Sequence, residues 1–262
     1  MLSLISAGTL RTPGFAFGYR GAHVVDVPMT LAVLKRADGT VLLVDAGLSA
    51  AEIARPIAAM GAHGLLFQIP GGADQSAVAQ LSHLGVAPSD VKTIVATHLH
   101  LDHIGGFVDF PDAEIVVAAS ELAAARRLGK SAGYLHTDRL LRSGRLRPVL
   151  LDATPRHGFP SHLDLLGDGQ VVLLDARGHT AGNVGVLLTD PTSGRRLLHA
   201  GDAAYAAHEF RERRISFFAR FTRFREDWLR ETWGHLQAFE AANSEIPVIL
   251  SHDPAALSSF PD

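Results

Sequence analysis

The chain contains no cysteine among its 262 residues. Disulfide bonds and thiolate metal ligands are therefore excluded, and any metal must be held by His, Asp or Glu. An excess of charge of one sign is also missing, because the formal net charge is only −3 and acidic and basic residues are interspersed. This balance gives no electrostatic reason to expect a nucleic acid as a partner.

Long apolar runs and boundary signals are absent as well. No segment approaches the ~18 consecutive apolar residues that a membrane-spanning helix requires, and the first residues lack the basic segment of a signal peptide. We therefore expect a cytoplasmic protein that does not associate with a membrane. No repeat, low-complexity linker or block of like charges marks a boundary, so residues 1–262 are predicted to form a single domain.

Short apolar segments alternate with segments of helical spacing. Strands are predicted at the start of the chain, within residues 23–49 on both sides of a turn at Asp38-Gly39, and in residues 91–97, 113–119, 169–180, 184–190, 195–205 and 246–254. Helices are predicted for residues 74–85, for residues 120–129 with Ser120 as N-cap, and for residues 225–243, which have one apolar face. Strands that repeatedly run into helices favour an α/β sandwich with its sheets inside. The pattern does not determine the topology.

Residues 97–106 read THLHLDHIGG and place three histidines and an aspartate within six positions. In an extended segment alternate side chains share a face, so His98, His100 and Asp102 would point one way and the leucines the other. His103 follows where the chain turns and can reach a neighbouring metal. These ligands exceed what one tetrahedral zinc with an open position takes from one segment. The motif therefore predicts half of a two-metal site, with a polar surface turn as the alternative.

Three later polar residues each follow an apolar strand: His179, Asp202 and His252. Strand ends are where α/β proteins assemble their sites, so these residues are candidates for the remaining ligands. Taken alone, a histidine at a strand end is more often a surface residue or a partner of a ligand. Their value as candidates depends on the motif at residues 97–106.

The motif HLHLDH, preceded by VDAG and followed by GHTAGN, GDAAY and SHD, resembles the metallo-β-lactamase superfamily. The resemblance extends from about Val41 to Asp253 in the family's order. It implies an αβ/βα four-layer sandwich of the α/β class, with the site at one edge of two sheets. It also implies two divalent metal ions, expected to be Zn²⁺. Their ligands would be His98, His100 and His179 for one ion, Asp102, His103 and His252 for the other, and Asp202 for both, while Asp45 supports the site loop.

Several branches of this superfamily match these residues less well. Class B β-lactamases mostly have a cysteine where Asp202 stands, and flavodiiron proteins have a glutamate where His100 stands. Persulfide dioxygenases bind one iron without the second set of ligands, which is complete here. The nucleases of the superfamily usually carry an RNA-binding arm or a further domain. These differences favour a hydrolytic site with two metals, although manganese, cobalt or iron would accept the same ligands.

Tyr205 stands three positions after Asp202, a spacing similar to that of the N-acyl homoserine lactonases. The resemblance implies that a hydroxide shared by two metals opens an N-acyl homoserine lactone or a related lactone. Tyr205 would stabilise the oxyanion, and Asp102 would carry a proton to the leaving alkoxide. The alternative is that Tyr205 only packs there. Arg177 replaces a usual proline, and Asn183 stands where His or Gln is frequent.

Other functions remain open on the same site. A glyoxalase II-like thioesterase or a phosphotriesterase would use these ligands, whereas a metal-binding relative without catalysis would usually have lost some of them. A nuclease would need a basic surface. Aromatic residues around the site could line a pocket for a small-molecule substrate with an apolar tail. Alternatively, they could belong to the core or to the interface of a homodimer. These residues are Phe15, Phe17, Tyr19, Phe210, Phe217, Phe218, Phe221 and Phe224. The protein is expected to be a monomer or a homodimer.

Overall fold

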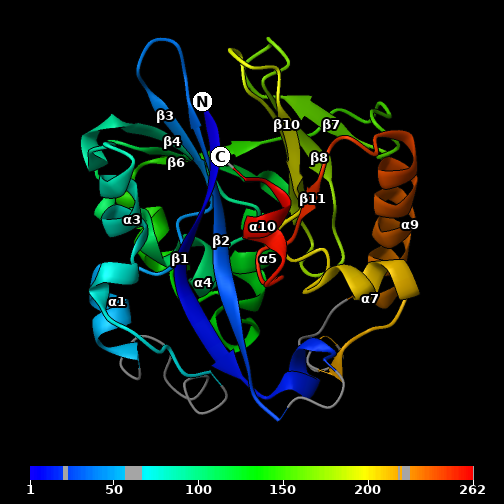
Figure 1. The fold of residues 1–262 in the computed structure, drawn as a ribbon, viewed down its shortest axis with the longest axis horizontal. Helices are drawn as coiled ribbons and strands as arrows, with labels where there is room; N and C mark the ends of the chain where they lie inside the picture. Colours follow the sequence, from blue (N-terminus) through cyan, green and yellow to red (C-terminus); the bar gives the residue numbers. More distant parts are fainter. Residues whose placement is uncertain (20–22, 57–66, 218, 220–224, 262) are drawn as a thin grey trace.

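A computed structural model describes residues 1–19, 23–56, 67–217, 219 and 225–261. Within these ranges two mixed β-sheets face each other, and helices cover the outer face of each sheet (Figure 1). The predicted αβ/βα four-layer sandwich is therefore confirmed. None of the helices described is long and apolar enough to span a membrane.

The first sheet has the strand order β1-β2-β3-β4-β5-β6. Its strands are β1 (Leu2–Thr12), β2 (Val25–Lys35), β3 (Val41–Val44), β4 (Val91–Val95), β5 (Glu114–Ala118) and β6 (Leu146–Val149). The first three strands are antiparallel, and the predicted turn at Asp38-Gly39 joins β2 to β3. Strands β3 to β6 are parallel. The carboxyl ends of β3 and β4 therefore lie side by side, which brings Asp45 next to the motif that starts at Thr97.

The second sheet has the order β11-β10-β9-β8-β7. Its strands are β7 (His162–Asp164), β8 (Val171–Asp175), β9 (Val184–Thr189), β10 (Arg196–His199) and β11 (Val248–Ile249). Strands β6 and β7 were not predicted from the sequence. Both are edge strands, and their residues LRPV and HLD are largely exposed or half-buried. An edge strand does not require the continuous apolar run by which buried strands are recognised.

The helices are α1 (Ala50–Ala54), α3 (Ala77–His83), α4 (Leu101–Ile104), α5 (Ala119–Leu128), α6 (Thr137–Ser143), α7 (Ala207–Glu212), α9 (Glu226–Ala242) and α10 (Ala256–Ser259). Short 3₁₀ segments span Gly14–Phe17, Ala73–Gln75, Pro88–Asp90, Gly105–Asp109 and Lys130–Ala132. Helix α3 is shorter than predicted because Ser76 caps it by accepting the Ala79 N–H at 3.4 Å. The predicted Ser120 cap is wrong, because β5 runs directly into α5 and Ala118 takes the cap position.

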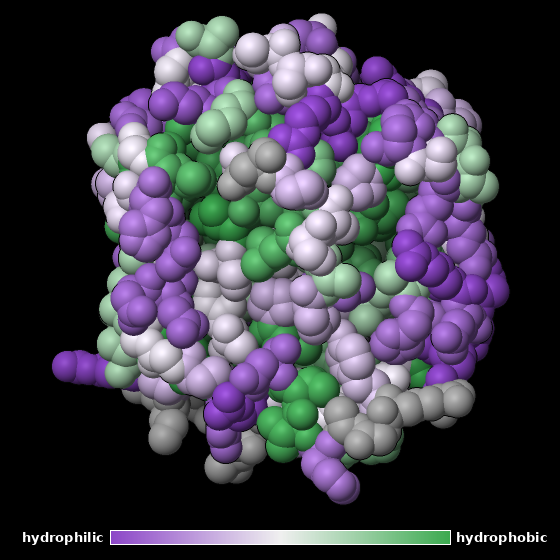
Figure 2. Space-filling model, viewed as in Figure 1, coloured by the Kyte–Doolittle hydropathy of each residue, from purple (hydrophilic) through white to green (hydrophobic). Residues whose placement is uncertain are grey.

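Three clusters of buried apolar side chains join the sheets to each other and to the helices. Between the sheets, residues such as Val44 and Val95 share a cluster with Leu173 and Val186 of the second sheet. A second cluster joins the first sheet to α3, α5 and α6. A third joins the second sheet to the buried face of α9, which includes Trp233. The outer side of α9 is hydrophilic (Figure 2), so the predicted amphipathic helix is confirmed.

The side chain of Trp233 gives a test of this packing. It is 1% exposed, and its indole N–H donates to the carbonyl oxygen of Ala203 at 2.7 Å. We expect Trp233→Phe to lower the free energy of unfolding by about 1–3 kcal/mol, because a buried carbonyl loses its donor. Urea denaturation followed by circular dichroism measures the change. Trp228→Phe is the control, since its half-buried indole makes no hydrogen bond to the part of the chain described here; an equal loss in both variants would contradict the prediction.

Candidate metal centre

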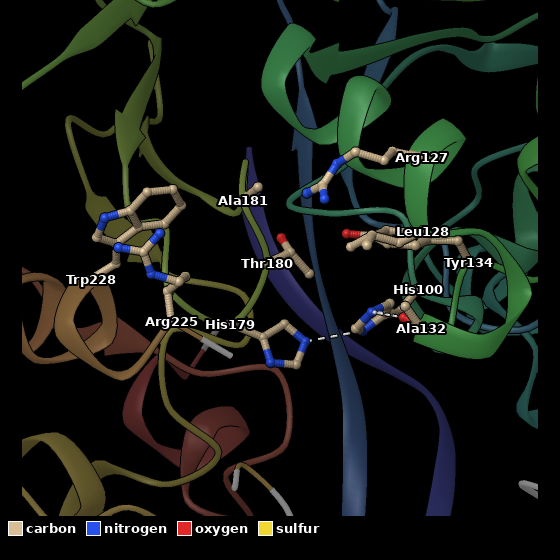
Figure 3. Close-up of a pocket in the computed structure, with 11 residues that line it drawn as sticks. His100, Arg127, Leu128, Ala132, Tyr134, His179, Thr180, Ala181, Arg225 and Trp228 are labelled. Carbon is tan, nitrogen blue, oxygen red and sulfur yellow. Dashed lines mark hydrogen bonds between the residues drawn. The ribbon is translucent and has the colours of Figure 1, made fainter. Parts of the chain in front are cut away.

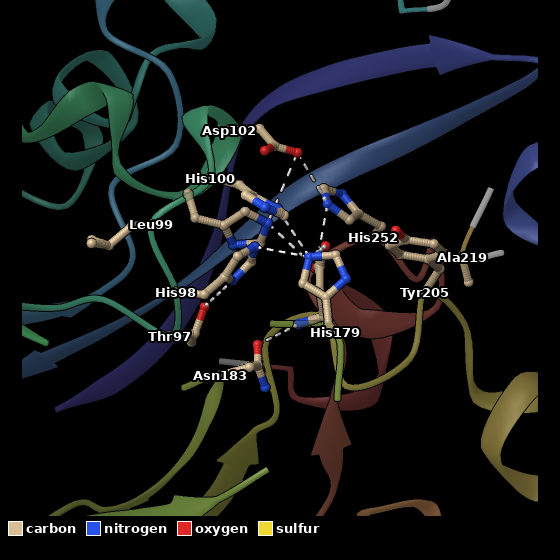
Figure 4. A network of polar contacts seen from close by, with 12 residues as sticks. Thr97, His98, Leu99, His100, Asp102, His179, Asn183, Tyr205, Ala219 and His252 are labelled. Atoms are coloured by element: carbon tan, nitrogen blue, oxygen red, sulfur yellow. Dashed lines mark hydrogen bonds and ion pairs between the residues drawn. The ribbon is translucent and has the colours of Figure 1, made fainter. Parts of the chain in front are cut away.

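Seven side chains from the predicted positions converge at one edge of the two sheets. They come from the segments that follow β4, β8, β10 and β11 (Figure 4). The structure brings them into three overlapping groups, in each of which the potential ligand atoms lie within 4.8 Å of one another. The groups are His98, His100 and His179; His98, His103 and Asp202; and Asp102, His103 and His252.

The carboxylate of Asp202 lies between the histidines of the two predicted sets. Its Oδ2 is 3.4 Å from Nε2 of His179. Its Oδ1 is 3.3 Å from Nε2 of His103 and 3.5 Å from Nε2 of His252. One carboxylate thus turns each of its oxygens to a different set, which is the arrangement that a ligand shared by two cations needs.

In two histidines, the hydrogen bond of the outer ring nitrogen fixes the position of the proton. The inner ring nitrogen is then left with a lone pair. Nε2 of His100 is 3.1 Å from the carbonyl oxygen of Ala132, and Nδ1 of His252 is 2.9 Å from that of Pro28. A carbonyl oxygen only accepts, so each outer nitrogen carries the proton. In the neutral imidazole, Nδ1 of His100 and Nε2 of His252 therefore present lone pairs to the cluster.

Asp45 likewise fixes which ring nitrogen carries the proton in His98 and His103. Its Oδ2 accepts the Thr97 hydroxyl at 2.9 Å and Nδ1–H of His103 at 2.8 Å. Because the Thr97 hydroxyl donates to Asp45, it accepts from Nδ1–H of His98 at 3.1 Å. The inner Nε2 atoms of His98 and His103 are thereby left as lone-pair donors, a pattern found around metal-binding histidines.

The donor set fits a cation. Nε2 of His179 lies 3.1 Å from Nε2 of His98 and 3.0 Å from Nδ1 of His100. A single proton on His179 could satisfy only one of these two lone pairs, whereas a metal ion would satisfy all three nitrogens. Imidazole nitrogens and carboxylate oxygens in this arrangement are suitable ligands for Zn²⁺.

Burial sets the charge of the first group. It disfavours the imidazolium form, and it lowers the pKa of His98 and His100 and that of His179 to about 3. These three rings are therefore neutral at neutral pH. Neutral imidazole is the form that binds a metal.

The carboxylates set the charge of the second group. Burial disfavours the charge on Asp102 and Asp202, but the neighbouring histidines, His103 first, outweigh it and lower the pKa of both. Burial also disfavours charge on His103 and His252, yet the two carboxylates raise the pKa of both rings. The carboxylates are ionised and need cationic partners, and a divalent metal would replace the histidine protons in that role.

The main departure from the sequence prediction concerns the backbone of the motif. Residues Leu101–Ile104 form the helical turn α4, in which the His100 carbonyl accepts the Ile104 N–H at 3.1 Å. The prediction that His98, His100 and Asp102 alternate along an extended segment is therefore wrong for Asp102. Leu99 and Leu101 do not share a face either, because they pack in different clusters.

Glu121 supports the site and was missed in the sequence. Its fully buried carboxylate accepts the Leu99 N–H at 3.0 Å and the Gly182 N–H at 3.1 Å. It thereby fastens the segment of His98 to the segment of His179. The available signal was its position, because Glu121, Ala124 and Ala125 share one apolar face of α5 at helical spacing.

The other candidate residues fall in different environments. Tyr205 is buried with its ring centroid 5.8 Å from that of His179 and 6.1 Å from that of His252. Phe210 is fully buried in the core beneath α9, whereas Phe15 and Phe217 are exposed and their rings meet at 5.3 Å. The remaining aromatic residues are the buried Phe17, the half-buried Tyr19, and Phe218, Phe221 and Phe224, which lie outside the described residues.

The two positions that depart from the lactonase pattern have structural roles. The Asn183 side chain donates to the carbonyl oxygens of Ala176 and Ala200 at 2.9 and 3.3 Å and accepts the Asp202 N–H at 3.4 Å. It therefore holds the segment that carries Asp202. Arg177 pairs with Asp175 at 3.2 Å.

Comparison with known proteins places this geometry in a family. A model described as the metallo-beta-lactamase superfamily matches residues 25–237. The N-acyl homoserine lactonase AttM of Azorhizobium caulinodans is 34% identical over 189 residues, which cover 71% of this chain and 67% of AttM. The probable metallo-hydrolase Rv2300c of Mycobacterium tuberculosis is 32% identical over 196 residues, which cover 69% of this chain and 60% of that protein.

Solved structures share the fold. A mutant of AiiA from B. thuringiensis, with N-decanoyl-L-homoserine at its active site, superposes with a TM-score of 0.78 and 20% identity, covering 99% of this chain and 96% of AiiA. AidC, described as a dizinc quorum-quenching lactonase in complex with a product, has a TM-score of 0.61 and 18% identity, covering 97% of this chain and 87% of AidC.

The role of Asp45 can be tested by metal affinity. Asp45→Asn replaces one acceptor oxygen by a donor amide, so the bonds to Thr97 and His103 cannot all persist. We expect zinc affinity to fall about 10- to 100-fold, as for other partners of metal-binding histidines, in a competition titration with a chromophoric chelator. The control is Asp109→Asn. Asp109 accepts the Ala50 N–H at 2.9 Å and is not one of the residues in the cluster. Equal affinity of Asp45→Asn and the unaltered protein would refute this role.

Glu209 gives a prediction about pH. Its carboxyl group is 2% exposed and accepts the N–H groups of Tyr205 at 2.7 Å and Ser216 at 2.9 Å. Burial is the main cause that raises the pKa of Glu209 from 4.5 to about 7. Because the folded-state pKa is raised, its contribution to stability is fully present below the unfolded pKa and is lost as pH rises through about 7.

We therefore compare the free energy of unfolding with that of Glu209→Gln, which cannot ionise. The excess stability of the unaltered protein over the variant should decrease by on the order of 2 kcal/mol between about pH 5 and about pH 8. Urea denaturation with a chelator present measures this difference without a contribution from metal binding. A difference that stays constant with pH would show that Glu209 does not titrate in this range.

Proposed function

The chain belongs to the metallo-beta-lactamase superfamily, and on that premise we propose that it is a hydrolase that uses two divalent metal ions to open lactones. The observation that carries the proposal is the position of Asp202, whose two oxygens face different sets of histidines. A carboxylate between two cations is typical of sites that activate water for hydrolysis.

The ligand sets follow from the three groups of side chains. His98, His100 and His179 would hold one ion, Asp102, His103 and His252 would hold the other, and Asp202 would contact both. Nitrogen and oxygen donors without thiolates favour Zn²⁺. When bound, two such ions supply a Lewis acid for a carbonyl group and lower the pKa of water toward neutral.

The chain's own residues would complete the reaction. The Tyr205 ring lies beside His179 and His252, where its phenol could donate to the oxyanion that develops on the lactone carbonyl. The Asp102 side chain is 25% exposed, against 4% for Asp202. Asp102 can therefore exchange protons with solvent and deliver one to the alkoxide of the opened ring.

Lactones are the proposed substrates because of the relatives. AttM is an N-acyl homoserine lactonase, and the solved structure of AiiA holds N-decanoyl-L-homoserine. An apolar tail on the substrate would suit aromatic side chains of this kind: the buried Phe17 packs against the Tyr205 ring at 4.4 Å, and Phe15 and Phe217 are exposed, with their rings 5.3 Å apart. Quorum quenching would be the consequence if the lactone is a bacterial signal.

The test is hydrolysis of a panel by the zinc-loaded protein. The panel contains a short and a long N-acyl homoserine lactone, a simple aliphatic lactone, a glutathione thioester and an aryl phosphotriester. We expect the lactones to be opened, Asp202→Asn to abolish turnover, and Tyr205→Phe to lower kcat about 10²- to 10³-fold, as for the loss of another oxyanion donor. Zinc content of both variants is measured alongside. Turnover confined to the thioester or the phosphotriester would reject the lactonase proposal.

A further inference from the structure

A second feature of the site is a cavity on the side of His100 and His179. Its volume is about 260 Å³, and it lies between the end of α5 and the start of α9 (Figure 3). The imidazoles of these two histidines form part of its wall. Tyr205 and His252 are not among the described residues that line it.

The wall of this cavity combines apolar and cationic side chains. Leu128, Ala132 and Ala181 supply apolar surface, and Arg127 and Arg225 supply positive charge. Figure 3 shows Arg127 extending from α5 on the opposite side of the cavity from Arg225 and Trp228. An anionic group that entered between them would meet a guanidinium on either side.

The two arginines differ in how far their charge is already balanced. Arg225 makes two hydrogen bonds to Asp227, at 3.0 and 2.6 Å, and stacks 4.4 Å from the centre of the Trp228 ring. Arg127 has no carboxylate within 4.0 Å among the residues that the structure describes. A guanidinium that lines a cavity without an acidic partner offers paired N–H donors to a carboxylate.

We propose that this cavity binds a carboxylate carried by the substrate, with Arg127 as the residue that determines this specificity. The proposal rests on the proposed lactonase function, because the cavity is placed relative to the metal ligands His100 and His179. The preferred substrates would be lactones whose side chain ends in a carboxylate. One unbalanced guanidinium matches a single negative charge, which favours a carboxylate over a phosphate dianion.

The size of the cavity suits a short side chain. Its volume of about 260 Å³ has room for several non-hydrogen atoms. A short carboxyalkyl chain would cover Leu128, Ala132 and Ala181 with its methylene groups and bring its carboxylate to Arg127.

Arg126 provides a matched control. It stands beside Arg127 in the last turn of α5 and is exposed, as Arg127 is, but it is not among the described residues that line the cavity. Both arginines interact favourably with the carboxyl end of the helix dipole. Replacing either one by glutamine therefore removes the same charge from the same turn, and only Arg127→Gln removes it from the cavity.

The experiment compares two lactones with the same ring and the same short side chain, one ending in a carboxylate and the other in its methyl ester. For the zinc-loaded protein we expect kcat/KM to be at least about tenfold higher for the carboxylate, the scale of one charge-assisted hydrogen bond. Arg127→Gln should remove this preference through KM with little change in kcat. Arg127→Lys should restore part of it, and Arg126→Gln should keep it.

Binding of monomethyl glutarate, measured by calorimetry on the zinc-loaded proteins, tests the cavity without turnover. We expect binding at least about tenfold weaker in Arg127→Gln than in Arg126→Gln. Equal binding or equal preference in these two variants would overturn the proposal, and so would stronger binding of a matched phosphate. Failure of all lactones to react, with the difference in binding intact, would reject the lactonase function and retain the anion site.

Discussion

The crowding of two carboxylates, the buried Asp202 and the half-buried Asp102, among five histidines is the constraint on which the site depends. Asp102 and Asp202 are surrounded by imidazoles, and a buried charge is costly unless it is balanced. Four of the five histidines are oriented by outer partners: Asp45 orients His98 through Thr97 and His103 directly, and the carbonyl oxygens of Ala132 and Pro28 orient His100 and His252. The parallel pairing of β3 with β4 places Asp45 next to Thr97. The fold thus creates a polar cluster whose geometry and charge suit divalent cations.

The surroundings of this cluster are different on its two sides. Near His252 the buried ring of Tyr205 packs against Phe17. Near His100 a small cavity carries the unbalanced charge of Arg127. A substrate held at the metal centre could place an apolar part on one side and an anionic part on the other. This asymmetry, rather than the ligand set, is where the chain can differ in specificity from relatives with the same fold.

Much of the fold could be predicted because buried strands have a simple signature. The segments at β4, β8, β9 and β10 are short and rich in Val, Ile and Leu, and polar residues at their ends indicated the edge where the site lies. Strands β6 and β7 were missed because edge strands do not need that pattern. The helical turn at Leu101–Ile104 was missed because it is held by hydrogen bonds to the His100 carbonyl. The sequence of these four residues does not reveal such bonds, which override the alternation of an extended segment. Glu121 was missed because its partners are backbone N–H groups from two loops distant in sequence.

We propose that this cluster holds two metal ions in separate sets of ligands that share Asp202. Native mass spectrometry of the zinc-loaded protein, with His179→Ala and His252→Ala measured beside it, tests this claim most directly. We expect two zinc ions per chain in the unaltered protein and one in each variant, because each substitution removes a ligand from only one set. A single ion in the unaltered protein, or the loss of both ions in both variants, would contradict it.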